Sequence, residues 1–160
     1  MTGRGETESG AAVVGQLTNL PAWEAELILS LRFWMDGPEG RQQVWSSFSR
    51  CFGSIEGRRH LRLFEGLLGS LCGHARRPLV RHGPGCSCIG SDEAVFVTLV
   101  REAARGDIAE AALIASLMVP AGQAELIALR AAEVGQALQR MTCNVQPNVT
   151  QAAPLARRLH

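Results

Sequence analysis

Hydrophobic residues recur at intervals of three and four along most of the chain, which is the spacing of one face of an α-helix. The first such stripe belongs to a helix that is predicted to begin near Pro21 and to end at Asp36-Gly37-Pro38. Its members are Leu20, Trp23, Leu27, Ile28, Leu31, Trp34 and Met35. A second helix is predicted over 38–52. A third begins at Ser54 and is expected to stop at Gly73, because glycine favours a helix end and Pro78 prevents continuation.

Three more helices are predicted in the second half of the chain. The fourth begins at Ser91, the fifth at Asp107 and the sixth after Pro120, and the last stripe ends at Met141. Alanine is abundant in the last two, which permits helices to pack closely. No segment alternates apolar and polar residues with period two, so a βαβ or barrel fold is not expected. The sequence therefore predicts an all-α fold, a single compact bundle of five or six helices.

The helical pattern divides the chain into three parts. Residues 1–19 are polar and glycine-rich and are predicted to be a flexible N-terminal arm, residues 20–142 a helical domain, and residues 143–160 a disordered C-terminal tail. Helices three and four are separated by the loop 73–90. Loops of this length are uncommon in compact domains unless something orders them, so we expect an ordering group here.

Composition narrows the cellular setting. All 16 basic residues are arginine, which suggests the codon use of a GC-rich bacterial genome. The N-terminus shows no signal-peptide pattern, and no apolar stretch approaches the ~20 residues of a membrane-spanning helix. We therefore expect a cytoplasmic protein with no membrane partner.

Positive charge is concentrated in the middle of the chain. Residues 50–82 carry seven arginines and two glutamates. Arg76, Arg77 and Arg81 are candidates to bind an anionic ligand, since a guanidinium grips phosphate or carboxylate with two parallel hydrogen bonds. DNA binding by this segment is an alternative. The isoelectric point of about 7.7 does not favour it, because nucleic-acid-binding domains are usually strongly basic.

The loop also concentrates metal-ligand residue types. Cys72, His74, His82, Cys86 and Cys88 fall within seventeen residues. Zinc commonly takes four such ligands in a tetrahedron. The preferred set is Cys72, His82, Cys86 and Cys88, with His74 as the substitute. A structural zinc here is expected to clamp the end of helix three to the start of helix four.

Helix geometry limits the ligand set. Residues 72 and 74 lie about 200° apart on a helix, so they can share a metal only if the helix stops at Gly73. His60 precedes Cys72 on the same helix by a distance of about 18 Å and cannot join the site. It is expected to be a partly buried helix residue.

The sequence is compatible with three functions. The leading one is a regulatory or protein-interaction module with a structural zinc site, which is not an enzyme and whose partner is a protein. The alternatives are a DNA-binding transcriptional regulator and a zinc- or thiol-dependent enzyme that uses Cys86 and Cys88. Against the enzyme, the chain lacks the motifs of zinc deaminases and zinc proteases. The carboxylates of Asp92 and Glu93 are accounted for by the first turn of the fourth helix.

Overall fold

The computed structural model describes the backbone of residues 10–156 and the side chains of residues 10–141. In that part the elements follow the order β1 (Val13–Gln16), η1 (Leu17–Asn19, a 3₁₀ turn), α2 (Ala22–Met35), α3 (Pro38–His74), β2 (Cys88–Gly90), α4 (Ser91–Ala104), α5 (Ile108–Ala115) and α6 (Ala121–Ala156). The predominantly helical class is confirmed.

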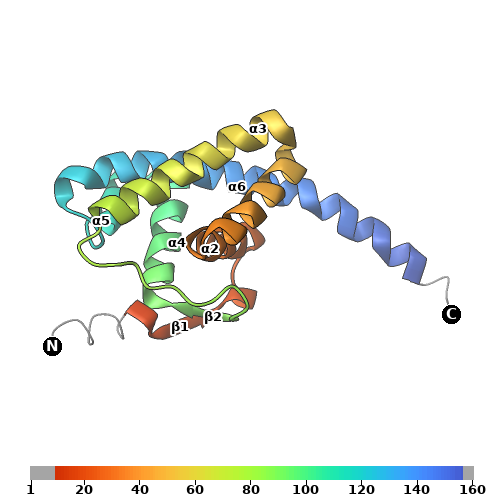
Figure 1. The fold of residues 1–160 in the computed structure, drawn as a ribbon, viewed down its shortest axis with the longest axis horizontal. Helices are drawn as coiled ribbons and strands as arrows, with labels where there is room; N and C mark the ends of the chain where they lie inside the picture. Colours follow the sequence, from red (N-terminus) through yellow and green to blue (C-terminus); the bar gives the residue numbers. More distant parts are fainter. Residues whose placement is uncertain (1–9, 157–160) are drawn as a thin grey trace.

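The helices share one core around α4. Figure 1 shows α4 in the middle of the molecule, with α3 and α6 running across one end of it and the small sheet at the other. The core is fully buried, and its larger members are Leu27, Ile28, Leu31, Phe48, Phe64, Leu67, Leu68, Leu71, Phe96, Leu99 and Ile127. The stripes read from the sequence therefore face inward.

Helix α3 bends at Gly53, which has φ 81° and ψ 171°. A positive φ is accessible to glycine because it has no Cβ. The bend separates 38–52 from the part that starts at Ser54, which are the second and third helices that the sequence predicts. The two form the arms of α3, separated by the non-helical backbone of Gly53.

Helices α4 and α6 approach each other closely at Gly135. A Cβ atom at this position would lie 2.7 Å from the Cβ of Ala104 and 3.0 Å from Cγ1 of Val100. These separations are shorter than van der Waals contact. Glycine therefore permits this approach between the helices.

The described part of the chain also contains a small two-stranded sheet, which the sequence did not predict. β1 and β2 pair antiparallel, with Val13 opposite Gly90 and Gln16 opposite Cys88, and the ladder is irregular between Val13 and Gly15. Strands of four and three residues are too short to show a period of two. The pairing also gives residues 13–16 a defined partner, β2, at the end of the loop. These residues lie inside the segment that is predicted to be a flexible arm.

Two helix ends differ from the expected ones. α3 continues through Gly73 to His74, and α6 extends to Ala156, into the segment for which a disordered tail is predicted. The tail prediction for 157–160 and the arm prediction for 1–9 fall outside the described residues. Within residues 10–156, no helix is both long and apolar enough to cross a membrane.

Candidate functional site

The loop between α3 and β2 is held by an arginine from a different part of the chain. Arg32 of α2 is completely buried. Its Nη1 donates to the carbonyls of Cys86 (2.6 Å) and Gly83 (3.2 Å), and its Nη2 donates to the carbonyl of Cys88 (2.6 Å). Three loop carbonyls are thus fixed by one guanidinium.

Glu93 of α4 neutralises this arginine. Its Oε1 accepts from Arg32 Nε at 2.7 Å, and its Oε2 accepts from Arg32 Nη2 at 3.0 Å. Oε1 also accepts from the backbone N–H of His82 (3.1 Å), and Oε2 from that of Gly90 (2.9 Å). All five guanidinium donors therefore have acceptors, as a buried charged pair requires.

The neighbouring carboxylate fixes the first part of the loop. Asp92 accepts two hydrogen bonds from Arg77, at 2.7 and 2.8 Å, and one from the backbone N–H of Val80 at 2.9 Å. Asp92 is 8% exposed. Asp92 and Glu93, which the sequence assigns to the first turn of a helix, thus also bind the loop that precedes it.

Two of the predicted metal ligands lie near each other. The Sγ of Cys86 and the Nδ1 of His82 are 3.9 Å apart, while His82 Nε2 lies 3.1 Å from the carbonyl oxygen of Ala11. Cys88 Sγ accepts a long hydrogen bond from Gln16 Nε2 at 3.6 Å. Each of these side chains is thus in contact with another group of the chain.

The other two predicted ligands lie at the exposed end of α3. Because this helix continues through His74, the condition under which Cys72 and His74 could share a metal is not met, and the expected stop at Gly73 is wrong. Among the described residues, no group of three or more His, Cys, Asp and Glu side chains has an arrangement that could hold a metal. The zinc site stays a prediction.

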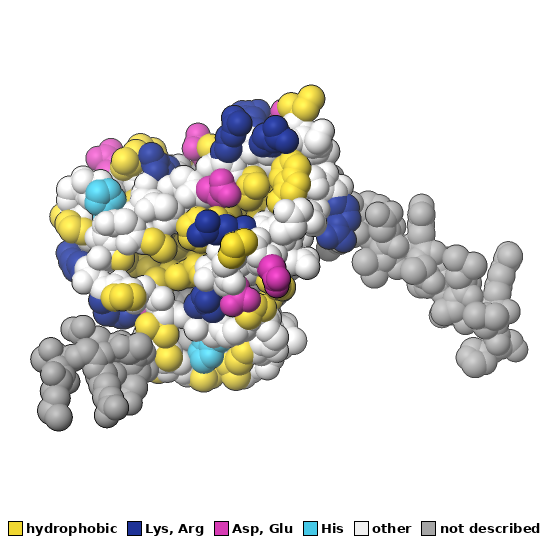
Figure 2. Space-filling view, viewed as in Figure 1, with side chains coloured by type: hydrophobic (Ala, Val, Ile, Leu, Met, Phe, Trp, Pro, Cys, Tyr) yellow, Lys and Arg dark blue, Asp and Glu magenta, His cyan; other side chains and the backbone are white. Residues whose placement is uncertain are grey.

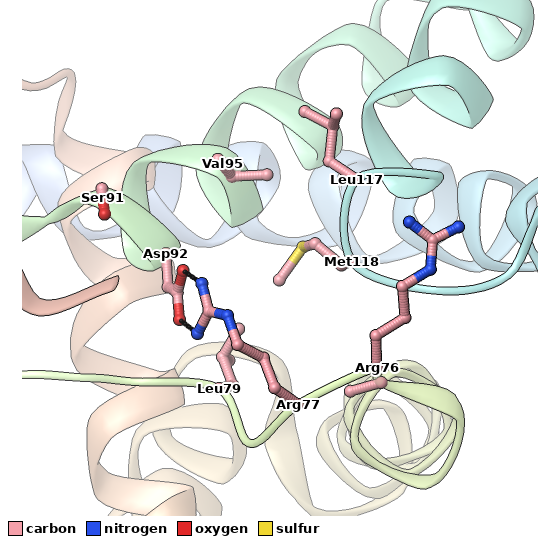
Figure 3. A pocket seen from close by; sticks show the side chains of 9 residues that line it. Arg76, Arg77, Leu79, Ser91, Asp92, Val95, Leu117 and Met118 are labelled. Carbon is pink, nitrogen blue, oxygen red and sulfur yellow. Dashed lines mark hydrogen bonds and ion pairs between the residues drawn. The ribbon is translucent and has the colours of Figure 1, made fainter. Parts of the chain in front are cut away.

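A pocket of about 400 Å³ lies between the first part of the loop, α4 and the turn after α5. It is lined by Ala75, Arg76, Arg77, Leu79, Ser91, Asp92, Val95, Leu117 and Met118. Figure 3 shows the Arg77–Asp92 ion pair at one end, the guanidinium of Arg76 at the other, and the Met118 side chain between them. The backbone N–H of Arg76 donates to the carbonyl of Met118 at 3.0 Å, which fixes the loop against the turn after α5.

The three arginines predicted to bind an anion differ in their surroundings. Arg77 binds Asp92, and Arg81 donates to the carbonyl of Met35 at 3.1 Å and lies 3.8 Å from the Asp36 carboxylate. The side chain of Arg76 is exposed and makes no hydrogen bond or ion pair with any described residue. Arg76 is therefore the arginine of this set that can meet a ligand in the pocket.

No protein-family model, curated protein or solved structure matches the chain.

Two charged residues of α2 were missed by the sequence reasoning. Both lie within the apolar stripe: Arg32 falls four residues after Ile28, and Glu24 falls four residues before it. Both are buried, and Glu24 binds Arg101 of α4 at 2.7 and 3.1 Å. This bond and the charge of Glu24 raise the pKa of Arg101. A charged residue inside an apolar stripe was the available signal that a buried partner exists.

Proposed function

We propose that the protein is a regulatory binding module whose pocket beside the loop takes a small molecule with one anionic group and an apolar body. The observation that carries the proposal is the Arg76 guanidinium, unpartnered among the described residues, at the end of a pocket whose walls include Val95, Leu117 and Met118. A carboxylate paired with Arg76 leaves the rest of the ligand against these apolar side chains.

The charges around the pocket limit the ligand to a single anionic group. The bidentate Arg77–Asp92 pair is neutral as a unit, and its carboxylate repels a second anion at that end. The volume falls within the range of small-molecule pockets and suits an apolar body of roughly six to ten carbon atoms. We therefore expect a medium-length alkyl or aryl carboxylate.

The pocket supports binding rather than catalysis. Among the described residues that line it there is no Cys or His, and their one carboxylate, Asp92, already accepts bonds from Arg77 and from the Val80 backbone. A general base needs a free lone pair directed at the substrate. Regulation is proposed because the ligand would contact both the loop and α4, and so affect how the two are held together.

Calorimetric titration with three probes tests the proposal. Octanoate carries both charge and tail, 1-octanol only the tail, and acetate only the charge. We expect measurable binding of octanoate that is at least roughly tenfold tighter than that of either partial probe, because the ion pair and the apolar contact act together. Equal binding of octanol and octanoate would exclude a role for Arg76.

Variants separate the two contributions. Arg76→Gln should weaken octanoate roughly tenfold and leave octanol unchanged, whereas Leu117→Ser should weaken both. Arg105→Gln is the matched control, since Arg105 is also exposed and pairs with Glu102 on α4. The proposal fails if Arg76→Gln and Arg105→Gln have the same effect.

A further inference from the structure

The outer corner of α3 carries a second, independent surface. After the bend at Gly53, Ile55, Arg58, Arg59 and Arg62 are spaced by three, one and three residues, which places them on one helix face. We call these four residues the basic corner. Figure 1 shows that the bend lies at the outer edge of the molecule, away from the loop and its pocket.

The opposite face of this segment is fixed in the core. Gly57, His60 and Phe64 are buried, so the basic corner cannot rotate inward. Ile55 is 82% exposed, the highest value among the large hydrophobic side chains of the described part. Figure 2 shows arginine side chains gathered at this corner beside exposed apolar atoms. An isoleucine is thus presented to solvent within a cluster of positive charges.

The arginines of the corner are only weakly engaged within the protein. Arg59 lies 3.4 Å from Glu56, and both side chains are more than half exposed. The guanidinium of Arg58 lies 5.7 Å from the centre of the Trp45 ring. Arg62 has no ion pair or hydrogen bond with the described residues, and Glu65 is the next acidic residue along the helix. Because exposed ion pairs contribute little to stability, all three arginines can bind an external anion at little cost.

We propose that the basic corner binds an anionic membrane surface, with Ile55 inserted between the headgroups. This revises the expectation from the sequence that the protein has no membrane partner. A bilayer offers both partners that this surface needs, since its anionic headgroups attract arginine and its hydrocarbon takes up an apolar side chain. Nucleic acid supplies the charge but leaves an isoleucine at the protruding corner without an apolar partner.

Sedimentation of the full-length protein with lipid vesicles tests this proposal. The probes are vesicles of phosphatidylcholine alone and vesicles in which about a third of the lipid is phosphatidylglycerol. Partitioning should be at least roughly tenfold stronger onto the anionic vesicles, since each arginine near the surface contributes severalfold. Raising the salt from about 50 mM to 500 mM should remove most of it, because the Debye length falls below the width of the patch.

Two variants and two matched controls identify the surface. Ile55→Ser should reduce partitioning onto anionic vesicles roughly tenfold, because the inserted side chain is lost. Arg62→Gln should reduce it several-fold, because one positive charge near the headgroups is lost. Leu126→Ser removes another exposed apolar side chain, on α6, and Arg105→Gln removes another exposed arginine, directly after α4. Both controls should bind like the unmodified protein. Ile55 and Arg62 are exposed, so neither variant is expected to unfold.

Three results would overturn the proposal. The first is equal partitioning onto the two kinds of vesicle. The second is an Ile55→Ser variant that partitions like Leu126→Ser. The third is salt-sensitive binding of a single-stranded oligonucleotide that requires Arg62 but not Ile55, without binding to vesicles, which would assign the corner to nucleic acid.

Discussion

Arg32 and Glu93, 61 residues apart in the sequence, form a bidentate ion pair at 2.7 and 3.0 Å in which neither side chain is exposed to solvent. The pair connects α2 to the first turn of α4, and the same two side chains bind the loop through three carbonyls and two backbone N–H groups. Contacts within the protein thus contribute to ordering the loop for which the sequence predicts a zinc site.

Removing one partner of this pair should be strongly destabilising. Arg32→Met leaves the Glu93 carboxylate buried without its counterion, which typically costs about 3–5 kcal/mol of unfolding free energy. Urea unfolding followed by circular dichroism measures the loss. Amide hydrogen exchange should also become faster in residues 80–90, because these are the residues that the pair holds.

The second ion pair between α2 and α4, formed by Glu24 and Arg101, is the matched control. Arg101 is 29% exposed at its side chain, so Arg101→Met should cost clearly less than Arg32→Met. The double variant Arg32→Met/Glu93→Met should be less destabilised than the sum of the two single variants, because no charge is left unpaired. Strictly additive losses would contradict a coupled pair.

Two glycine substitutions should have opposite effects on stability, because only Gly135 lies at the crossing of α4 and α6. Gly135→Ala should destabilise by about 1–3 kcal/mol, because its Cβ would overlap with Ala104. Gly69→Ala on the exposed face of α3 meets nothing within 4 Å and should stabilise by about 0.5–1 kcal/mol through helix propensity. Thermal unfolding compares the two. A stabilised Gly135→Ala would show that the helices can separate there without cost.

His60 should make stability depend on pH. Burial and the positive charge of Arg140 lower its pKa from the ordinary value of 6.5, with a smaller contribution from Arg59, while Glu56 acts in the opposite direction. The unfolded chain therefore binds more protons than the folded one between the lowered pKa and 6.5. The free energy of unfolding should fall as pH decreases through this window, by at most about 1.4 kcal/mol per pH unit for one proton.

Denaturant titrations at pH 7.5, 6.5 and 5.5 measure this dependence. His60→Leu should flatten it, because the titrating group is removed. The Nδ1 of His60 is buried without a hydrogen-bond partner, so replacing the ring breaks no hydrogen bond at Nδ1. His74→Gln, which changes an exposed histidine, is the control. An unchanged slope in His60→Leu would show that other groups cause the pH dependence.

Metal removal should leave the fold intact. The loop is held by Arg32, Glu93 and Asp92, so we expect treatment with a strong chelator to leave the helical circular dichroism and the melting temperature unchanged. Elemental analysis before and after chelation tests the zinc prediction itself. Loss of stoichiometric zinc together with loss of helicity would restore the metal as the clamp.

Local signals in the sequence were sufficient for the helices and for most of their ends. Proline and glycine act within a few residues, so Pro21, Gly37 and Gly53 mark where α2 and both arms of α3 begin and end. The spacing of Leu27, Ile28 and Leu31 likewise showed which face is buried. The expected stop at Gly73 failed because glycine permits a helix end without requiring one.

Tertiary structure decided what the loop does. The acceptors of Arg32 lie 51 to 61 residues away, and β1 pairs with a strand more than 70 residues later. No periodicity carries such information, because a charged residue in an apolar stripe reveals that it needs a partner but not which one. The sequence by itself determined a helical protein with a loop rich in cysteine and histidine. Only the fold determined that a buried arginine holds that loop and that Arg76 faces the pocket, since both depend on segments brought together from distant parts of the chain.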